Sequence, residues 1–400
     1  MAVFADLVVL ELASVLAGPS VGQFFAELGA AVIKVENPAT GGDVTRRWTL
    51  PTEDAAAERS AYFAAANWGK QSVAIDLRRA EGQRLLRDLA AQADIVVSSY
   101  KPGDAAKLGA DFETLAAANP RLLYAEVVGY PQGSPGSDRA GYDAVVQAES
   151  GFTFMNGEAG GPPVKMPVAL VDVLAAHQLK EALLVGLLER ERTGRGGRFT
   201  VSLFESAVAS LANQATNWLT GGHAPQRMGS AHPNIAPYGT VFQTANGEGV
   251  VLAIGTDRQF AALGEVLEMD AIAGAPRFAT NAQRVRNRPF LDLLLAERIA
   301  AWDRDRLLAA LAERHVPAGA VNDLPAVFEQ PAAQALVVRD EALAGVRHVA
   351  FQPGSGIAET LTPPPRYAAD TRTVLAERLG TDEETVERLR RAGVVEVRET

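Results

Sequence analysis

Short runs of β-branched residues alternate with helix-forming segments through the first 130 residues of the chain. Such alternation is typical of βαβ units, whose parallel strands are covered by helices on both faces. The runs that we expect to form strands are residues 7–12, 31–35, 72–77, 94–98 and 121–127. We therefore predict an α/β fold built on an open, doubly wound and mainly parallel sheet.

The length of the chain indicates more than one domain. A single hydrophobic core rarely grows beyond about 250–300 residues, and this chain has 400. An expected helix over 205–219 is followed by a stretch rich in glycine and proline, GGHAPQRMGSAHPNIAPYG. A second pattern of strands and helices comes next, and the last part of the chain begins with an expected strand near 346–351. We predict a large discontinuous domain and a smaller α+β domain, in the order 1–220 (large domain, first part), 221–238 (linker), 239–322 (small domain), 323–345 (linker) and 346–400 (return to the large domain).

Composition and hydropathy exclude several classes of partner. The formal net charge of -10 lacks the positive balance that binding to a nucleic-acid backbone requires. No window approaches the roughly 20 apolar residues of a membrane span, and the N-terminus lacks the basic region of a signal peptide. We therefore expect a cytoplasmic protein that binds neither nucleic acid nor membrane.

The inventory of reactive side chains narrows the chemistry. The chain has no cysteine, which excludes disulfides, thiolate nucleophiles and cysteine-ligated metals. Its five histidines do not cluster at the spacing of metal ligands, so we predict no metal site. Covalent chemistry in this protein must use another side chain.

The first strand–helix–strand unit imitates a dinucleotide-binding fold. Gly18 and Gly22 lie near its first turn, and Glu36 ends the second strand, where a ribose ligand would lie. The sequence G-x-G-x-x-G is absent, however, and Pro19 has no amide to donate to a pyrophosphate. The missing motif and Pro19 thus argue against a nicotinamide or flavin cofactor, in spite of the Rossmann-like pattern. A strand-to-helix turn with free amides still suits some phosphorylated ligand.

Asp172 stands where a glycine-rich stretch gives way to a long apolar helix, in the sequence VALVDVLAAH. One interpretation is structural, because an aspartate in this place can cap the helix. The other is catalytic, because a carboxylate with apolar neighbours near a positive helix end can be ionised yet poorly hydrated, as a nucleophile must be. The local sequence does not decide between them.

Basic residues recur near the expected carboxyl-terminal edge of the sheet. Each one alone would be an ordinary solvated charge. Grouped beside the aromatic side chains of Trp48 and Tyr100, they could bind a nucleotide with several phosphates. The group comprises Arg46, Arg47, Lys70, Lys101 and Lys107.

Motifs distributed along nearly the whole chain carry a family resemblance. They are LELASVLAGPSVGQFFAELGAAVIKVENP, NWGKQSVAIDL, YKPG followed by KLG, GYD followed by QAESG, GGPPV ahead of Asp172, and RTGRGG ahead of an expected strand. Together they resemble the family III CoA-transferases, a family that also includes formyl-CoA transferase, carnitine-CoA transferases and α-methylacyl-CoA racemase. Any one of these motifs alone would be weak.

The resemblance implies an enzyme whose nucleophile is Asp172. The carboxylate would attack a donor thioester to form an aspartyl anhydride, and the released CoA would convert it to an aspartyl-CoA thioester. No cofactor would be bound permanently, because acyl-CoA and a small carboxylic acid are the substrates. The residues that the resemblance places against CoA, the last of them at a phosphate, are Ser14, Val15, Leu16, Ala17, Ile75, Ser99, Tyr100 and Lys107.

The chain departs from formyl-CoA transferase at several positions. That enzyme carries bulkier or charged groups where this chain has Ser14, Leu16, Asn37 and Ala140, and its glycine loop in the small domain is replaced here by RMGSAHPNIAPY. The contacts to an oxalate-type acceptor are therefore not carried over. The family further implies an interlocked homodimer, whereas the identities of the acyl donor and acceptor do not follow from the sequence.

Tyr142 and Asp143 bear on the choice between transferase and racemase. In the racemase branch a histidine precedes the matching aspartate and helps to move the α-proton, whereas this chain has Tyr142 there. A phenol with an unperturbed pKa of about 10 is a poor general base near neutrality. We therefore expect CoA transfer, with a racemase or epimerase as the first alternative and a non-catalytic acyl-CoA-binding protein as the second.

Overall fold

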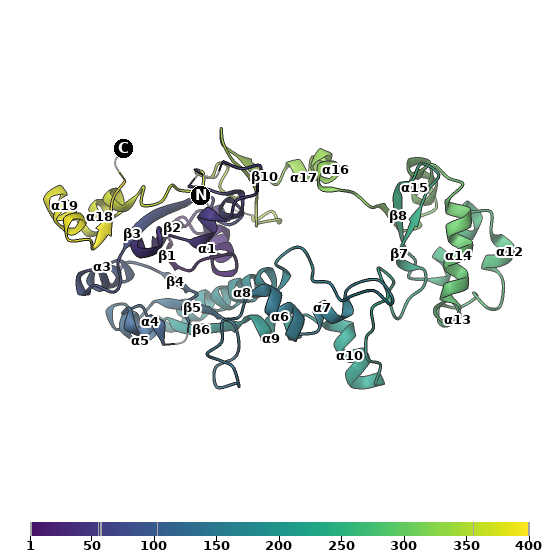
Figure 1. The fold of residues 1–400 in the computed structure, drawn as a ribbon, viewed down its shortest axis with the longest axis horizontal. Coiled ribbons are helices and arrows are strands. Elements are labelled where there is room, and N and C mark those ends of the chain that lie inside the picture. Colours follow the sequence, from purple (N-terminus) through teal and green to yellow (C-terminus); the bar gives the residue numbers. More distant parts are fainter. Residues whose placement is uncertain (1, 55, 57, 102, 355, 399–400) are drawn as a thin grey trace. The chain divides into compact units, whose positions relative to one another are not determined.

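The computed structural model describes residues 2–54, 56, 58–101, 103–354 and 356–398 (Figure 1). The chain divides into two compact units. The first comprises Met1–Ser150, Met166–Ala215 and Leu336–Thr400, and the second comprises Gly151–Lys165 and Thr216–Ala335. The chain therefore leaves the first unit and returns to it twice.

A seven-stranded sheet forms the centre of the first unit. Its strands are β1 (Val8–Leu12), β2 (Ala31–Glu36), β3 (Lys70–Ile75), β4 (Ile95–Ser98), β5 (Leu123–Val128), β6 (Gly197–Ser202) and β12 (Val395–Glu396). They are ordered β12-β3-β2-β1-β4-β5-β6, and only β12 runs antiparallel to its neighbour. The order 3-2-1-4-5-6 is that of a doubly wound Rossmann-type sheet, which confirms the predicted fold class.

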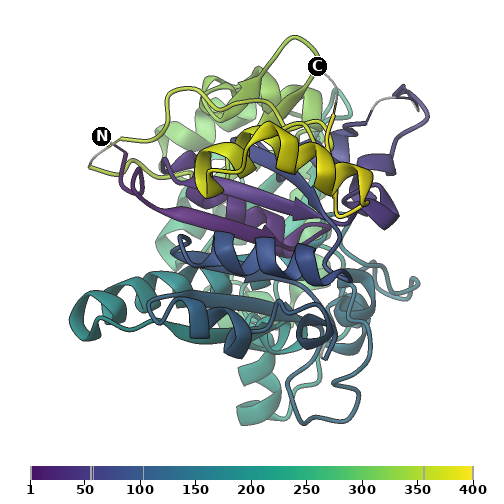
Figure 2. The same cartoon turned by 90° about the vertical axis from the view of Figure 1, so that its left-hand side faces the viewer.

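Helices cover both faces of this sheet. On one face α1 (Ala17–Glu27) packs against α8 (Leu170–Thr193), which also contacts β5 and β6. On the other face α3 (Ala80–Ala90), α5 (Phe112–Ala118), α18 (Thr371–Leu379) and α19 (Glu383–Arg391) share one apolar core with the strands. The yellow C-terminal helices lie against the purple strands in Figure 2, so the end of the chain completes the layer begun at its start.

Side-chain alternation gives the two faces of the sheet different chemistry. Leu10, Ile33 and Ile75 point into the apolar core shared with α3 and α18. Glu11 and Lys34 point the other way and are aligned with each other in the register of β1 and β2. The face under α1 therefore contains buried charges in strands whose sequences are otherwise apolar.

Two sequence predictions of local structure near this sheet were wrong. A continuous helix was expected over 205–219, but α9 (Leu203–Ala209) and α10 (Ala212–Gly221) are separate, because Ala212 adopts the left-handed region with φ of 47°. A strand was expected near 346–351, but β11 (Ala344–Val346) ends at Val346 and pairs only with β10 (Val337–Arg339) in a two-stranded hairpin. Alternation in so short a run does not specify a partner strand.

The second unit has a small antiparallel sheet covered by helices. Its strands are β7 (Tyr238–Gln243), β8 (Gly249–Ala253) and β9 (Ala318–Ala320). The helices that share its apolar core are α11 (Asp257–Val266), α14 (Arg288–Ile299) and α15 (Arg304–Glu313). Residues 151–165 belong here although the sequence assigned them to the range 1–220, because Arg227 Nε donates to Gly161 O at 2.9 Å and Gly229 N to Gly157 O at 3.0 Å.

None of the helices within the described residues is both long and apolar enough to cross a lipid bilayer.

Candidate active site

The topology of the first unit places a crevice between β1 and β4. The chain leaves these neighbouring strands toward opposite faces of the sheet, through α1 after β1 and through α5 after β4. In open α/β sheets, ligands bind at such a switch point, outside the carboxyl ends of the strands. The two loops meet there, and Ser14 N donates to Ser99 Oγ at 3.1 Å.

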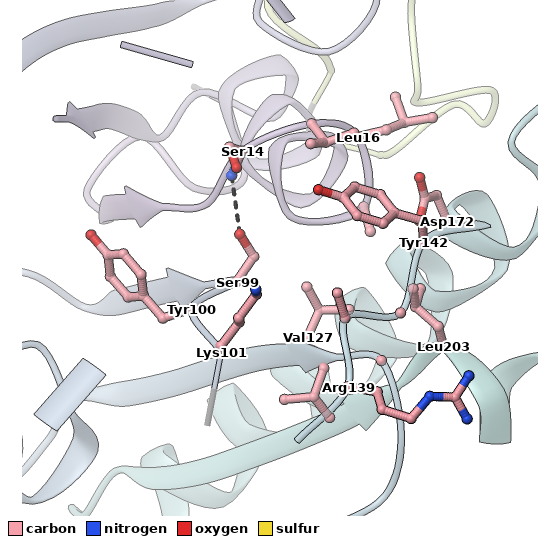
Figure 3. A pocket seen from close by; sticks show the side chains of 16 residues that line it. Ser14, Leu16, Ser99, Tyr100, Lys101, Val127, Arg139, Tyr142, Asp172 and Leu203 are labelled. Atoms are coloured by element: carbon pink, nitrogen blue, oxygen red, sulfur yellow. Dashed lines mark hydrogen bonds between the residues drawn. The ribbon is translucent and has the colours of Figure 1, made fainter. Parts of the chain in front are cut away.

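A cavity of about 160 Å³ lies at this point (Figure 3). It brings together residues that follow β1, β4 and β5 and the first turn of α8. Most of the residues expected from the sequence are among those that line it. The lining consists of Ser14, Val15, Leu16, Ala17, Ser99, Tyr100, Lys101, Val127, Val128, Gly129, Arg139, Ala140, Gly141, Tyr142, Asp172 and Leu203.

The turn from β1 into α1 forms one wall of the cavity and is held in an unusual conformation. Val15 has φ of 72°, which is strained for a β-branched residue. Asp43 Oδ1 accepts from Val15 N at 3.4 Å, and Lys34 Nζ donates to Ala13 O at 2.7 Å. No side chain among the described residues caps α1, so its first amides can serve a ligand.

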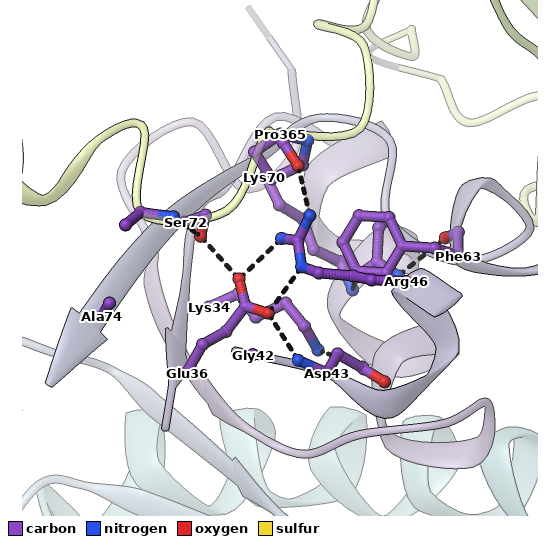
Figure 4. Close-up of polar contacts among 12 residues, drawn as sticks. Lys34, Glu36, Gly42, Asp43, Arg46, Phe63, Lys70, Ser72, Ala74 and Pro365 are labelled. Atoms are coloured by element: carbon purple, nitrogen blue, oxygen red, sulfur yellow. Dashed lines mark hydrogen bonds and ion pairs between the residues drawn. The ribbon is translucent and has the colours of Figure 1, made fainter. Parts of the chain in front are cut away.

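Next to this turn lies a group of buried charges joined in ion pairs, and Figure 4 labels three of its members, Lys34, Asp43 and Lys70, beside the neighbouring pair of Glu36 and Arg46. Glu11 accepts from Lys34 at 2.8 Å and from Lys70 at 2.6 Å, and Lys34 lies 2.9 Å from Asp43. Burial would lower the pKa of Lys34, but the surrounding carboxylates outweigh it and raise that pKa. Burial likewise would raise the pKa of Asp43, but Lys34 and the Thr45 hydrogen bonds lower it. We call Glu11, Lys34, Asp43 and Lys70 the buried ion cluster.

The buried ion cluster also explains a glycine of the first turn. A Cβ on Gly22 would lie 1.9 Å from Glu11 Oε2, so this glycine makes room for the carboxylate. Lys70 is buried in an ion pair with Glu11 at 2.6 Å, and Arg46 is buried in an ion pair with Glu36 at 2.7 Å. The hypothesis that these two cations bind a nucleotide is therefore wrong. Lysine and arginine side chains are almost never fully buried unless they are paired, and the sequence does not show the pairing. Their residue type alone therefore predicted that Lys70 and Arg46 would be exposed.

Asp172 is the third residue of α8 and lies in its first turn. The helix cap is Ala169, so the interpretation of Asp172 as a cap is wrong, because the helix begins two residues earlier than expected. The side chain is 8% exposed, and no hydrogen bond or ion pair from the described residues reaches its carboxylate. Burial, with a smaller contribution from the charge of Asp143, raises the pKa of Asp172 to about 7.

Asp143 supplies the capping hydrogen bond that the N-cap residue Ala169 cannot make with its side chain. It is the first residue of α6 (Asp143–Glu149), and its Oδ1 accepts from Val171 N at 2.9 Å. Its Oδ2 accepts from Gln147 Nε2 at 2.8 Å. Two carboxylates are thus held close together at one end of α8, and only Asp172 lines the cavity.

Two glycines bring Tyr142 and Asp143 to the end of β5. A Cβ on Gly141 would lie 2.3 Å from the Cα of Gly129, and one on Gly129 would lie 2.6 Å from the Cα of Gly141. The two backbones are therefore in direct contact. Tyr142 follows at once, 59% exposed, and its ring lies beside Asp172 in Figure 3.

Comparison with known proteins identifies the family. The model described as CoA-transferase family III matches residues 4–371. The chain belongs to CoA-transferase family III.

Relatives of this family III member include proteins named as CoA-transferases and proteins with solved structures. It is 42% identical to the succinate–glutarate CoA-transferase of Agrobacterium fabrum over 83% of each chain. It is 33% identical to the succinyl-CoA:glutarate CoA-transferase of Homo sapiens, over 98% of this chain and 90% of the human one. A CAIB/BAIF family protein from Brucella suis superposes with a TM-score of 0.83 at 40% identity, covering 94% of this chain and 100% of that one.

Two of the CoA contacts expected from the family III resemblance lie outside the cavity. The Ile75 side chain packs in the apolar core opposite α1, so it could offer a ligand only its backbone. Lys107 is exposed on the short helix α4 (Asp104–Lys107) and pairs with Asp104 at 2.8 Å. Asp143 also lies behind the cavity wall rather than in it.

Several cavity residues were not among the expected contacts of this family III chain. Leu203 and Arg139 line the cavity through segments distant in sequence from Asp172, and their sequence surroundings carried no sign of a ligand. Arg139 is held by Glu149 at 2.6 Å and lies over the ring of Tyr130. The sequence predicts Lys101 only as one member of a group of basic residues. The signal for it is its place directly after β4, at the switch point.

A second cavity, of about 340 Å³, adjoins the first in this family III chain. The two share Ser14, Ser99 and Tyr100 in their linings. The second cavity extends past Asn37 and Arg47, near the carboxyl end of β2. The carboxyl edge of the sheet therefore carries two joined hollows, one next to Asp172 and the other next to a cation.

Proposed function

We propose that this protein moves CoA from the thioester of a dicarboxylic acid to a second carboxylic acid, with Asp172 as the covalent nucleophile. One observation carries the proposal. Asp172 is a buried carboxylate without a cation or hydrogen-bond donor from the described residues, and it lines the cavity at the switch point of the sheet. Such a carboxylate is poorly solvated and hence reactive toward an electrophilic carbonyl.

The proposed reaction has four balanced steps. Asp172 attacks the donor thioester carbonyl, the C–S bond breaks, and an aspartyl anhydride and CoA thiolate result. The thiolate attacks Cγ of Asp172, which releases the donor acid and leaves an aspartyl-CoA thioester. The acceptor carboxylate attacks the same carbon and expels the thiolate. The thiolate then attacks the acceptor carbonyl, giving the new acyl-CoA and the free Asp172 carboxylate.

The position of Asp172 supports these steps physically. Because the pKa of Asp172 is about 7, close to half of the protein molecules carry an ionised Asp172 at neutral pH before substrate binds. The negative oxygens that develop at each attack need donors, and the backbone amides at the start of α1 and around Gly141 are near the cavity. The chain has no cysteine to serve instead.

The two joined cavities suggest how CoA would lie. We propose that the pantetheine arm passes the Ser14–Ala17 turn with the thioester at Asp172. The nucleotide would occupy the second cavity, where Tyr100 offers an aromatic face and Arg47 a phosphate partner. Lys101 lies at the cavity and could reach a further phosphate from the loop after β4, and Lys107 could do so by giving up its exposed pair with Asp104.

Similar enzymes guide the choice of acids. The relatives named above act, by name, on succinate and glutarate, and others are named for citramalate and oxalate. Each of these acids carries two carboxyl groups, and the donor is succinyl-CoA in the names of the human and citramalate enzymes but acetyl-CoA in that of the oxalate enzyme. We therefore propose a short dicarboxylic acyl group as the donor, which agrees with the modest volume of the cavity at Asp172.

A turnover assay tests the proposal. Purified protein is incubated with succinyl-CoA and glutarate, then with other pairs of CoA donors and acids, and the CoA products are identified by mass spectrometry. We expect a new acyl-CoA for at least one dicarboxylate pair and none with D172N. Hydroxylamine added during turnover should yield a hydroxamate on the peptide containing Asp172.

Two other outcomes would contradict CoA transfer. Entry of solvent deuterium at Cα of an acyl-CoA without exchange of CoA would indicate a racemase or epimerase. Acyl-CoA binding without turnover or trapping, across the whole panel, would indicate a binding protein.

We propose further that the protein is an interlocked homodimer, as the family resemblance implies, and that it is cytoplasmic, as its composition and hydropathy lead us to expect. Light scattering at micromolar concentration should give about twice the chain mass of 42.3 kDa. A monomer at every concentration would remove the dimer.

A further inference from the structure

Gln147 is a fully buried amide on α6 that binds the chain segment leading into α8. Its Oε1 accepts from Met166 N at 2.9 Å. Its Nε2 donates to Asp143 at 2.8 Å and lies 3.4 Å from Val168 O. One side chain thus ties α6 to Met166 and Val168, six and four residues before Asp172, although it does not line the cavity.

Asp143 completes the attachment. Its second oxygen accepts from Val171 N at 2.9 Å, and Val171 directly precedes Asp172. The backbone is therefore held at residues 166, 168 and 171 by two side chains four residues apart on one helix face. The cap residue Ala169 contributes no side-chain bond of its own.

The two attachments fix each other. A carboxylate can only accept, so the Gln147 amide must turn its nitrogen toward Asp143 and its oxygen toward Met166 N. Rotating the Gln147 amide by half a turn would set like groups against each other on both sides. The pair consequently has one hydrogen-bonded arrangement, and the start of α8 has one position.

We infer that Gln147 is a positioning residue of the active site, which acts with Asp143 to hold the start of α8 so that Asp172 faces the cavity in one orientation. The inference rests on the proposed role of Asp172 as nucleophile. It assigns to Gln147 a role in turnover through geometry, without contact to substrate.

The chain offers a matched control in Gln23 on α1. Gln23 is also fully buried, donates to an acidic residue four positions away, Glu27, at 2.9 Å, and accepts from Trp68 N at 3.2 Å. It differs in holding no segment next to Asp172. Comparing Q147M with Q23M therefore separates the loss of a buried amide from the loss of positioning.

We expect Q147M to lower kcat by about 30-fold with KM within about threefold, because small misplacements of a reacting group have effects of this size. Q23M should lose similar stability but keep kcat within about twofold. The swap D143N/Q147E restores the bond between residues 143 and 147 with donor and acceptor exchanged, while Met166 N and Val171 N can still donate to side-chain oxygens at 147 and 143. It should recover kcat to within about fivefold of wild type. D143N and Q147E alone should each resemble Q147M.

A second readout does not depend on turnover. The titration of Asp172 is followed through the pH dependence of urea unfolding, each variant being compared with the same variant carrying D172N. In Q147M we expect the midpoint, near 7 in wild type, to fall by at least about one pH unit, because a loosened helix start admits water. In Q23M it should not move.

The outcomes separate the two proposals. An unchanged Asp172 midpoint in Q147M overturns the positioning role, whether or not the wild type transfers CoA. If the wild type transfers no CoA but the Asp172 midpoint still shifts in Q147M, the proposed function is contradicted and the positioning of Asp172 by Gln147 is supported. Equal losses of kcat in Q147M and Q23M, or no recovery in the swap, would reduce Gln147 to a packing residue.

Discussion

Two groups of buried carboxylates lie on the same side of one sheet, and their electrostatics are opposite. In the buried ion cluster, Glu11 and Asp43 are paired with Lys34 and Lys70 within 2.9 Å. At the start of α8, Asp172 has no cation within ion-pairing distance among the described residues and faces the charge of Asp143. Burial is similar, yet the pKa of Asp43 is lowered and that of Asp172 is raised to about 7.

The comparison shows what distinguishes a structural carboxylate from a reactive one. The buried ion cluster satisfies its charges and in doing so fixes Ala13 O and Val15 N at the cavity wall. Asp172 has no partner among the described residues, and burial beside Asp143 makes its ionisation unfavourable in the folded chain, which is useful for chemistry. One group shapes the site and the other reacts in it, and neither assignment follows from burial alone.

Breaking the buried ion cluster should have the largest effect on stability. K34M leaves Glu11 and Asp43 buried with one cation fewer, and loss of one partner from such a pair lowers the free energy of unfolding by about 3–5 kcal/mol. Urea unfolding at pH 7 measures it. Lys180 is the control, since burial lowers its pKa to about 8 and it makes no ion pair within the part of the chain described. K180M should leave stability unchanged or raise it, and equal losses in both variants would contradict the comparison.

Removing the unsatisfied carboxylate should act in the opposite direction. The unfolded chain ionises Asp172 near 3.8 and the folded chain near 7, so wild type loses stability relative to D172N as pH rises through this window. At 1.36 kcal/mol per unit of pKa, the change reaches at most about 4 kcal/mol and is complete above neutrality. Urea unfolding of both proteins from pH 4 to pH 8.5 measures it. A difference that does not vary with pH would show that Asp172 titrates normally.

Catalysis should depend on the same titration. Only ionised Asp172 is a nucleophile, so kcat/KM in the CoA-transfer assay should fall about tenfold per pH unit below an apparent pKa of about 7. Circular dichroism at each pH controls for unfolding. A flat profile between pH 5 and pH 8 would mean that the step limiting kcat/KM does not involve this carboxylate.

The smallest effect is expected at an exposed cation. Lys107 pairs with Asp104 in solvent, and such pairs contribute little. K107A should raise KM for the CoA donor by no more than about threefold and leave kcat unchanged. R47A, at the second cavity, is the companion variant and should raise KM more, about tenfold. A larger effect in K107A than in R47A would place the CoA phosphates on the loop after β4.

Sequence patterns predicted the sheet well because its buried central strands stand out in the sequence as short β-branched runs. The β-branched runs are correctly placed, and the resemblance pointed to Asp172, which local sequence left undecided. Charges inside these runs, at Glu11 and Lys34, were the available sign of the buried ion cluster, because a buried strand rarely carries an unpaired charge. Their pairing with Asp43 depends on a loop that no periodicity describes.

The contacts around Asp172 could not be read from the sequence. The cap of α8 comes from Asp143, 28 residues before Val171, and tertiary contacts of this range leave no local pattern. The same holds for Ile75, whose place in a strand was correct but whose side chain faces away from the cavity. Strand position was predictable, whereas the face depended on register with the whole sheet.

The contact of Gly129 with Gly141 limits how this site can diverge or be redesigned. Any side chain at either position would collide with the backbone at the other and force the two segments apart. New acid specificities are therefore accessible mainly through the side chains that flank this contact, such as Leu203 and Val127. The backbone of the cavity wall is therefore constrained at this contact, whereas the side chains that line the cavity can be exchanged.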